Sequence, residues 1–382
     1  MFDFDKIVSR KRAIKHKYGS DYYMLSTADM DFESAIEIKE ALIKKANQGY
    51  YGYELKSAEY YNAIINWYQR HYQWSIKDEM IAVAPGIWVS LRLCLETFAK
   101  ESDNILVHYP TFHPIVEIAK KSKRNLIYSE LCYQDNSFEI DFALFEKQLQ
   151  QNIKIFILIN PHNPTGRVFT KEELTRIGNL CLKYNVLVIS DEVHGGIVFA
   201  DNKLLPFGSI SNEFANNSII LNSASKAYNL QGLTHAYLVI PNKKHRAMFE
   251  ETLQGYDLDF ATNIFSMAAL EAAYNGGDEW LKEVTSYLQN NLDYLDVFLK
   301  GELPQVKLIR PQGSYLAWLD ISSLGLNNDE IKELFINKGK IYFSFEESFS
   351  LNEGKFVRLN FACPLVVLKE ALLKIKEVID NN

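Results

Sequence analysis

The sequence predicts an α/β fold with a large domain built on a mostly parallel sheet and a second, smaller α+β domain. Three observations predict it. Short apolar segments rich in β-branched residues recur, segments with helical spacing separate them, and the last hundred residues change to a different alternation. Strands that are apolar throughout are typical of parallel sheets covered on both faces. A chain of 382 residues also exceeds what one core usually organises.

The elements of the large domain follow in order, with helices expected at 87–100 and 170–184 and strands at 105–108, 155–159, 186–190, 219–221 and 236–240. Asn160 and Asp191 directly follow two of these strands. Ligand crevices of α/β sheets lie outside the carboxyl ends of the strands. We therefore expect the functional site there.

The smaller domain begins with a long helical pattern over 278–299, and a final helix is expected after Pro364. Four strand-like segments lie between them: 306–309, 315–320, 341–345 and 356–361. We expect the start of the chain to pack against these elements. The predicted division is a large domain of residues 46–280 and a small domain of residues 1–45 plus 281–382.

Charge and composition exclude several classes of protein. The net charge is −7 and the pI about 5.7, which argues against binding nucleic acid or an anionic membrane. The four cysteines form no CxxC pair, and the apolar segments are too short to span a bilayer. No signal peptide is visible, so we expect a cytoplasmic protein. Signatures of dinucleotide, nucleoside triphosphate, serine-hydrolase and zinc sites are absent.

Polar residues at the strand ends are the candidates for chemistry. Lys226 follows a strand and is flanked by hydroxyl residues, so a buried amine of lowered pKa is possible there, although an exposed loop lysine fits as well. Asp191 can hold a protonated pyridine nitrogen, or else cap a helix. Asn163 lies in a turn and can donate to a phenolate oxygen. Gly86 opens a helix whose free N–H groups suit a phosphate.

Together these segments resemble a known family. The motifs at 160–166, 190–194 and 223–233 occur in the order found in fold-type I enzymes that use pyridoxal 5′-phosphate (PLP), within the class I/II aminotransferase superfamily. The ends of the chain, at 28–32 and 356–364, resemble the MalY/PatB subgroup of cystathionine β-lyases, or C–S lyases. The resemblance covers nearly the whole chain, and it implies a large-domain sheet of the seven-stranded type.

The resemblance also implies roles for individual residues. Lys226 would bind PLP covalently and then move protons, and Asp191 would pair with the pyridine nitrogen. Asn163 and His194 would lie beside the phenolic oxygen of the ring. Phe112 would stack on the ring face, where relatives often carry Tyr.

The phosphate and the substrate have their own expected residues. The phosphate would be bound by Gly86, Ile87, Trp88, Ser223 and Ser225, and by Tyr53 of a second subunit, since sites of the family lie at a dimer interface. Arg358 would hold the carboxylate of an amino-acid substrate, a bidentate task suited to Arg, with Ala28 and Asn163 beside it.

Three departures from the family pattern bear on the substrate. Thr234 stands where many members carry an Arg for the phosphate. Gly195 and Gly196 follow His194, where close relatives have an Asp at the second position. Residues 26–27 are Ser-Thr where relatives tend to have Trp-Val.

The expected reaction is β-elimination, in which an S-substituted cysteine such as cystathionine yields a thiol, pyruvate and ammonia. Transamination of an amino acid is the first alternative, because it uses the same residues up to loss of the Cα proton. A PLP-binding regulator that acts through protein contact is the second. The expected partners are a small-molecule substrate and a second copy of the chain.

Overall fold

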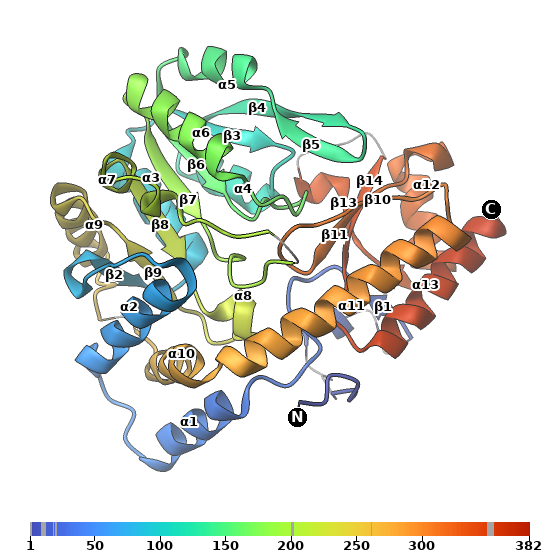
Figure 1. The fold of residues 1–382 in the computed structure, drawn as a ribbon, viewed down its shortest axis with the longest axis horizontal. Coiled ribbons are helices and arrows are strands. Elements are labelled where there is room, and N and C mark those ends of the chain that lie inside the picture. Colours follow the sequence, from blue (N-terminus) through green and yellow to red (C-terminus); the bar gives the residue numbers. More distant parts are fainter. Residues whose placement is uncertain are drawn as a thin grey trace.

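The computed structural model describes residues 2–8, 13–17, 19, 21–199, 202–260, 262–349 and 355–382. Its centre is one large sheet (Figure 1), whose strands lie in the order β2 (Ile81–Ala84), β9 (Ala236–Val239), β8 (Ser218–Asn222), β7 (Leu187–Asp191), β6 (Ile153–Ile159), β3 (Asn104–Tyr109), β4 (Asn125–Gln134) and β5 (Ser137–Ile140). Neighbouring strands from β8 to β4 are parallel, which confirms the predicted mostly parallel sheet.

Two strands reverse direction. β9 pairs antiparallel with both β2 and β8, and β5 forms an antiparallel hairpin with β4. The sequence predicted a buried strand at 236–240 but not its direction, because an apolar strand can run parallel or antiparallel to its neighbours. The eight strands are therefore the seven-stranded arrangement extended at its edge by β5.

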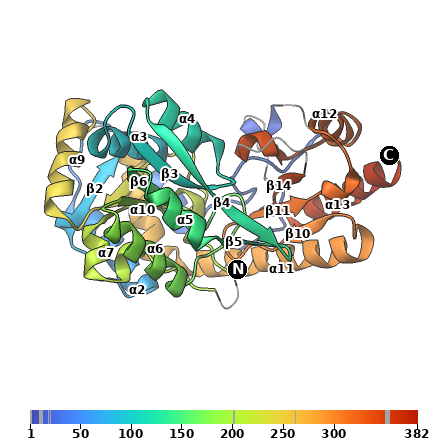
Figure 2. The ribbon, with the colours of Figure 1, turned by 90° about the horizontal axis from the view of Figure 1, so that it is seen from above.

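The central strands are mostly apolar because both faces of the sheet are covered there. In β6, Ile155 and Ile157 pack into one cluster, while Phe156 and Leu158 pack into the other. Successive strand residues point to opposite faces, so each face needs its own apolar layer. Figure 2 shows α3 (Ile87–Phe98) and α4 (His113–Lys121) on one side, and α2 (Ala58–Tyr72) and α6 (Lys171–Lys183) on the other.

The remaining helices of this part surround the sheet or follow it. They are α1 (Ile36–Asn47), α5 (Phe142–Leu149), α7 (Asn212–Asn216), α8 (Ser225–Tyr228), α9 (Lys243–Gly255) and α10 (Ile264–Gly276). Helix α6 begins as its sequence predicts, because Thr170 and Glu173 form a reciprocal capping box.

The smaller part is an antiparallel sheet in the order β10 (Lys307–Ile309), β11 (Leu316–Asp320), β14 (Phe356–Asn360) and β13 (Ser344–Phe345). The long α11 (Asp278–Glu302) and the final α13 (Leu365–Asp380) pack against each other beside it (Figure 1). The predicted strand 341–345 is divided, because β12 (Ile341–Tyr342) leaves this sheet to pair with β1 (Tyr23–Met24). A short α12 (Asn328–Lys332) runs into a π-helical turn, Glu333–Lys338.

The start of the chain is shared between the two parts. β1 joins the small part through β12, whereas α1 packs against α10 of the large part. A division after residue 45 would cut through α1, so we propose a boundary between β1 and α1 instead. Helix α11 continues from one part into the other, which makes residue 280 a point inside a helix.

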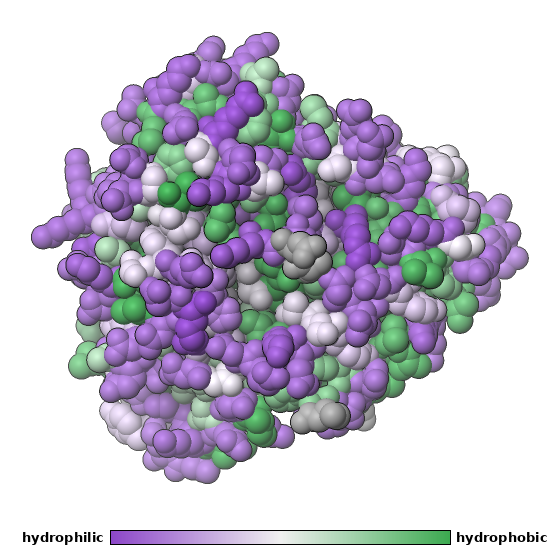
Figure 3. Space-filling model, in the orientation of Figure 1, coloured by the Kyte–Doolittle hydropathy of each residue, from purple (hydrophilic) through white to green (hydrophobic). Residues whose placement is uncertain are grey.

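The visible surface is mostly polar. Figure 3 shows hydrophilic side chains over most of one face, with hydrophobic ones in smaller areas between them. Within the described residues, no helix is both long and apolar enough to cross a membrane.

Candidate active site

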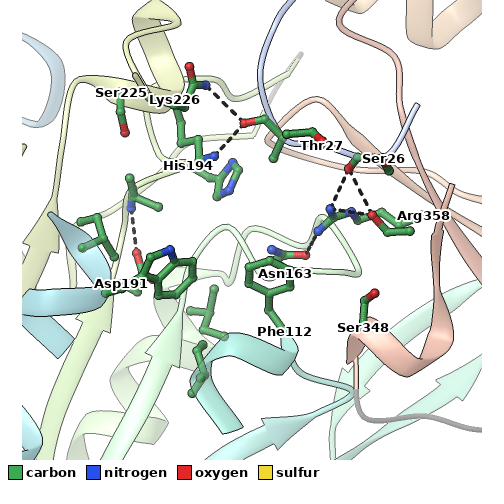
Figure 4. A pocket seen from close by; sticks show the side chains of 18 of the residues that line it. Ser26, Thr27, Phe112, Asn163, Asp191, His194, Ser225, Lys226, Ser348 and Arg358 are labelled. Carbon is green, nitrogen blue, oxygen red and sulfur yellow. Dashed lines mark hydrogen bonds between the residues drawn. The ribbon is translucent and has the colours of Figure 1, made fainter. Parts of the chain in front are cut away.

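A cavity of about 900 Å³ lies at the carboxyl ends of β6 and β7. Its wall combines the start of α3, the segment 26–28 and residues around Lys226 with residues 342–345, 347, 348 and 358 of the small part. Figure 4 shows Lys226, Asp191, Asn163 and Arg358 around this cavity. The predicted strand-end position of the site agrees with this arrangement.

Lys226 lies in α8, and its side chain crosses to the segment at the start of the chain. Its Nζ donates a hydrogen bond of 2.7 Å to the carbonyl oxygen of Ala28. Burial, and then the charge of Arg358, lower the pKa of Lys226 to about 8. A larger fraction of this amine is therefore neutral near pH 7 than is usual for lysine, as a nucleophile or base requires.

The carbonyl of Ala28 has two further donors. Tyr315 Oη lies 3.1 Å from it and Gln231 Nε2 lies 3.2 Å from it. Motif reasoning did not single out Gln231 or Tyr315. Gln231 lies inside the motif at 223–233, so its position could have suggested it, whereas no pattern in the sequence marks Tyr315.

The segment around Ala28 is held by side chains from distant parts of the chain. Asn360 Nδ2 donates to the carbonyls of Thr27 and Asp29, at 2.5 and 2.7 Å. Lys15 forms ion pairs with Asp29 and Asp31 at 2.9 and 3.2 Å. The segment is therefore fixed although it has no regular secondary structure.

Asp191 ends β7 and is 6% exposed. One of its oxygens accepts from the backbone N–H of Val193 at 3.2 Å, and among the described residues it has no salt-bridge partner. Burial raises the pKa of Asp191 to about 6, against the opposing effects of Val193 and of Lys226. A buried carboxylate without a cation is costly, so this residue fits a protonated ring nitrogen brought by a cofactor.

Arg358 presents the complementary case of a buried cation. Its Nη1 donates to Asn163 Oδ1 at 2.9 Å, and its Nη2 donates to Ser26 O and Ser344 Oγ, each at 3.0 Å. Burial lowers the pKa of Arg358 to about 9, so it remains charged at pH 7. In the described chain no carboxylate forms an ion pair with it, which leaves the charge for the carboxylate of a ligand.

An aromatic wall lies on one side of the cavity. The rings of Trp88 and Phe112 have centroids 5.7 Å apart, and the guanidinium of Arg358 lies 5.4 Å from the Phe112 centroid. Figure 4 shows Phe112 close to Asn163. A planar ring can stack against such a wall.

The start of α3 has the properties of an anion site. Gly86 precedes the helix without any side-chain cap, so the first backbone N–H groups, those of Ile87 and Trp88, are not satisfied by a cap. A Cβ added at Gly86 would meet no atom within 4 Å, because the backbone faces open space. Ser225 and Thr234 line the same cavity.

Ser223 lies elsewhere. Its hydroxyl donates to the carbonyl of His235 at 2.7 Å and accepts from the N–H of Ser225 at 3.1 Å, and it is not part of the cavity wall. Both contacts hold the loop before α8 in shape. The expected phosphate contact of Ser223 stays a prediction, and in this structure its hydroxyl is engaged within the loop.

His194 lines the cavity and forms a hydrogen bond of 2.9 Å between Nδ1 and Ser314 Oγ. Burial, with the charges of Lys226 and Arg358, holds the pKa of His194 well below its usual range, so the ring is neutral. Beside it, a Cβ at Gly196 would lie 2.6 Å from Ala227 Cβ. The backbone here is too close to α8 for a side chain, which accounts for the missing carboxylate.

Tyr53 lies outside the cavity and is 87% exposed. It contacts the ring of Phe260 edge-on, with centroids 6.4 Å apart. Its predicted role belongs to the site of a second subunit and is not tested by a single chain.

The family model for aminotransferases of class I and II matches residues 20–375. Cystathionine β-lyase PatB of Bacillus subtilis is 34% identical over 358 residues, which cover 94% of this chain and 92% of that protein.

Two solved structures share the whole architecture. A PLP-bound putative aminotransferase from Clostridium difficile matches with a TM-score of 0.96 and 36% identity, covering 99% of this chain and 100% of that chain. A PLP-bound C–S lyase from Staphylococcus hominis matches with a TM-score of 0.92 and 29% identity, covering 99% and 98%.

Proposed function

Because the chain belongs to the class I and II aminotransferase family, we propose that it is a PLP-dependent carbon–sulfur β-lyase acting on S-substituted cysteines such as cystathionine. The observation that carries the proposal is one cavity holding a lysine amine of lowered pKa, a buried carboxylate without a cation and a buried guanidinium without an anion. The first suits the cofactor's aldehyde, the second its ring nitrogen, and the third a substrate carboxylate. The printed names of the relatives agree with this chemistry.

The residues would divide the reaction between them. Arg358 would hold the substrate by its carboxylate and so limit the orientations open to its Cα–H bond. The Lys226 amine accepts the Cα proton, and the thiolate then leaves Cβ. PLP, when bound, supplies the electron sink for the pair released at Cα. By holding a proton on the ring nitrogen Asp191 would keep that sink strong, and Asn163 and His194 would lie beside the phenolic oxygen.

We further propose a homodimer. Large apolar side chains are exposed close together in sequence, at Tyr50, Tyr51, Tyr53 and Leu55, and Phe260 contacts Tyr53. Exposed aromatic and aliphatic groups of this kind are typical of interfaces between subunits. A second subunit would cover them and bring its Tyr53 to the phosphate.

We also place the protein in the cytoplasm. All four cysteines, Cys94, Cys132, Cys181 and Cys363, are free thiols, and three of them are buried. Unpaired cysteines suit a reducing compartment.

The test is an absorbance spectrum of the purified protein with L-cystathionine, with pyruvate and ammonia assayed in the same sample. We expect a visible cofactor band that is absent in Lys226→Ala, together with equal amounts of both products. Product that forms only with an added 2-oxo acid, and without ammonia, would establish transamination instead. Cofactor binding without any turnover would favour the regulator.

A further inference from the structure

The cavity has a second set of charges away from the proposed reaction centre. Apart from Asp191, Lys226 and Arg358, the residues of its described wall that carry a full charge are Lys332 and Glu347. Lys332 Nζ lies 2.6 Å from Glu347 Oε1. Their side chains are 35% and 48% exposed, so this pair marks the open side of the cavity, whereas Asp191 and Arg358 lie buried.

Both charges come from short helical elements. Lys332 ends α12, directly before the π-helical turn Glu333–Lys338, which also brings Ile336 to the cavity wall. Glu347 lies in a short 3-10 helix, Glu346–Phe349, whose last ring lies 4.8 Å from the guanidinium of Arg358. Figure 4 shows the next residue, Ser348, on the Arg358 side of the cavity.

A half-exposed ion pair adds little to the free energy of unfolding, so stabilising the fold does not account for this pair. Each group can also take a second partner without losing the first. The ammonium of Lys332 has three donors, and the carboxylate of Glu347 has about four acceptor positions. A ligand that carries both a carboxylate and an ammonium on one carbon can therefore join the pair.

We propose that Lys332 and Glu347 bind the second amino-acid head group of a thioether substrate, Lys332 its carboxylate and Glu347 its ammonium. This inference rests on the proposed lyase function and adds a preference to it: the leaving thiol carries an α-amino acid of its own. Arg358 would hold one end of such a substrate, and Lys332 and Glu347, here called the mouth pair, would hold the other.

The experiment uses four cysteine thioethers with the same chain length. L-Cystathionine carries both distal charges, S-(3-carboxypropyl)-L-cysteine only the carboxylate, S-(3-aminopropyl)-L-cysteine only the ammonium, and S-propyl-L-cysteine neither. We expect kcat/KM to fall about 10-fold from L-cystathionine to S-propyl-L-cysteine, mainly through KM, since exposed charge pairs contribute little each. Added salt should narrow the difference.

The variants separate the two contacts. Lys332→Met should weaken turnover of the carboxypropyl substrate a few-fold and leave the aminopropyl substrate unchanged, and Glu347→Gln should do the reverse. The double variant should turn over all four thioethers at the rate of the uncharged one. S-Propyl-L-cysteine is the internal control, because its kinetics should be the same in every variant.

Binding without turnover gives a second readout. L,L-2,7-Diaminosuberate has the length and both head groups of cystathionine but no sulfur leaving group, and L-2-aminoheptanoate lacks the distal head group. Calorimetry should show tighter binding of the former to the wild-type holoprotein and equal binding of both to the double variant.

Equal kcat/KM for all four thioethers, or equal losses for all of them in the variants, would overturn the proposal while leaving the lyase function intact. No turnover of any thioether would instead remove the lyase function. The mouth pair would then be judged by calorimetry alone, and equal affinity of the wild type for the two sulfur-free ligands would overturn it.

Discussion

The lowered pKa of Lys226 has a consequence that can be measured. A lysine with a pKa of about 8 is about 9% neutral at pH 7, whereas the ordinary value of 10.5 leaves about 0.03% neutral, a difference of about 300-fold. Only the neutral amine attacks an aldehyde. Lys226 should therefore capture PLP at neutral pH far faster than an exposed lysine does.

The assay follows capture in protein from which the cofactor has been removed. The rate of covalent attachment is measured by absorbance between pH 6 and 10, and borohydride reduction with mass spectrometry locates the attachment. Because the pKa is lowered, the rate should rise with pH up to about 8 and then level off. Lys226→Arg should show no specific attachment.

Two variants test the physical cause. Arg358→Met removes the second cause of the shift, so the midpoint should move to higher pH, yet stay below 10.5 because burial remains. Lys332→Met removes a charge from the same cavity that is not among the causes, and the midpoint should not move. A rate that continues to rise through pH 10 in the wild type would refute the reasoning.

Three further predictions concern charge and packing. Asp191→Asn should lower the rate of pyruvate formation by about 100-fold or more, although the amide oxygen of the new side chain can still accept the hydrogen bond from the Val193 N–H. Burial raises the pKa of Asp191 in the folded protein from 3.8 to about 6. Ionisation of Asp191 therefore destabilises the cofactor-free fold increasingly as the pH rises from about 4 to 6. The Asn variant should have a higher melting temperature than the wild type at pH 8, and the same melting temperature below pH 4. Thr234→Arg should tighten cofactor binding in equilibrium dialysis, since Thr234 lines the cavity and a guanidinium there would add charged donors for the phosphate; unchanged affinity would place the phosphate elsewhere. Trp318→Ala should cost about 3–5 kcal/mol in denaturant unfolding, because this fully buried ring stacks on Phe356 at 5.3 Å, and Trp318→Phe should cost less.

Five strands of the large sheet, β3 and β6 to β9, could be predicted, because they are buried on both faces and carry mostly apolar sequence, whereas β2 and β4 were not predicted. The direction of β9 could not be predicted, since a strand apolar on both faces looks the same in either direction. The edge strand β5 was missed for the opposite reason. Its sequence, Ser-Phe-Glu-Ile, is half polar, as suits a strand exposed at the sheet edge.

The motifs predicted which residues form the site, but they did not predict all of the contacts that these residues make. They placed Lys226, Asp191 and Arg358 together, which the cavity agrees with. They could not foresee that the Ser223 hydroxyl is engaged by His235, because a serine beside the lysine suits phosphate and loop equally. Lys332 and Glu347 carry no local signal, since their pairing spans two elements that the sequence does not connect.

The way Asn360 holds the carbonyls of Thr27 and Asp29 has a consequence for biosynthesis. The segment that covers the lysine leaves the ribosome long before Asn360, the residue that fastens it. At ordinary rates of translation the interval is on the order of half a minute. A chain that has not yet reached Asn360 has Lys226 but not its finished surroundings, so the capacity to trap a reactive aldehyde arises only after that residue has been added.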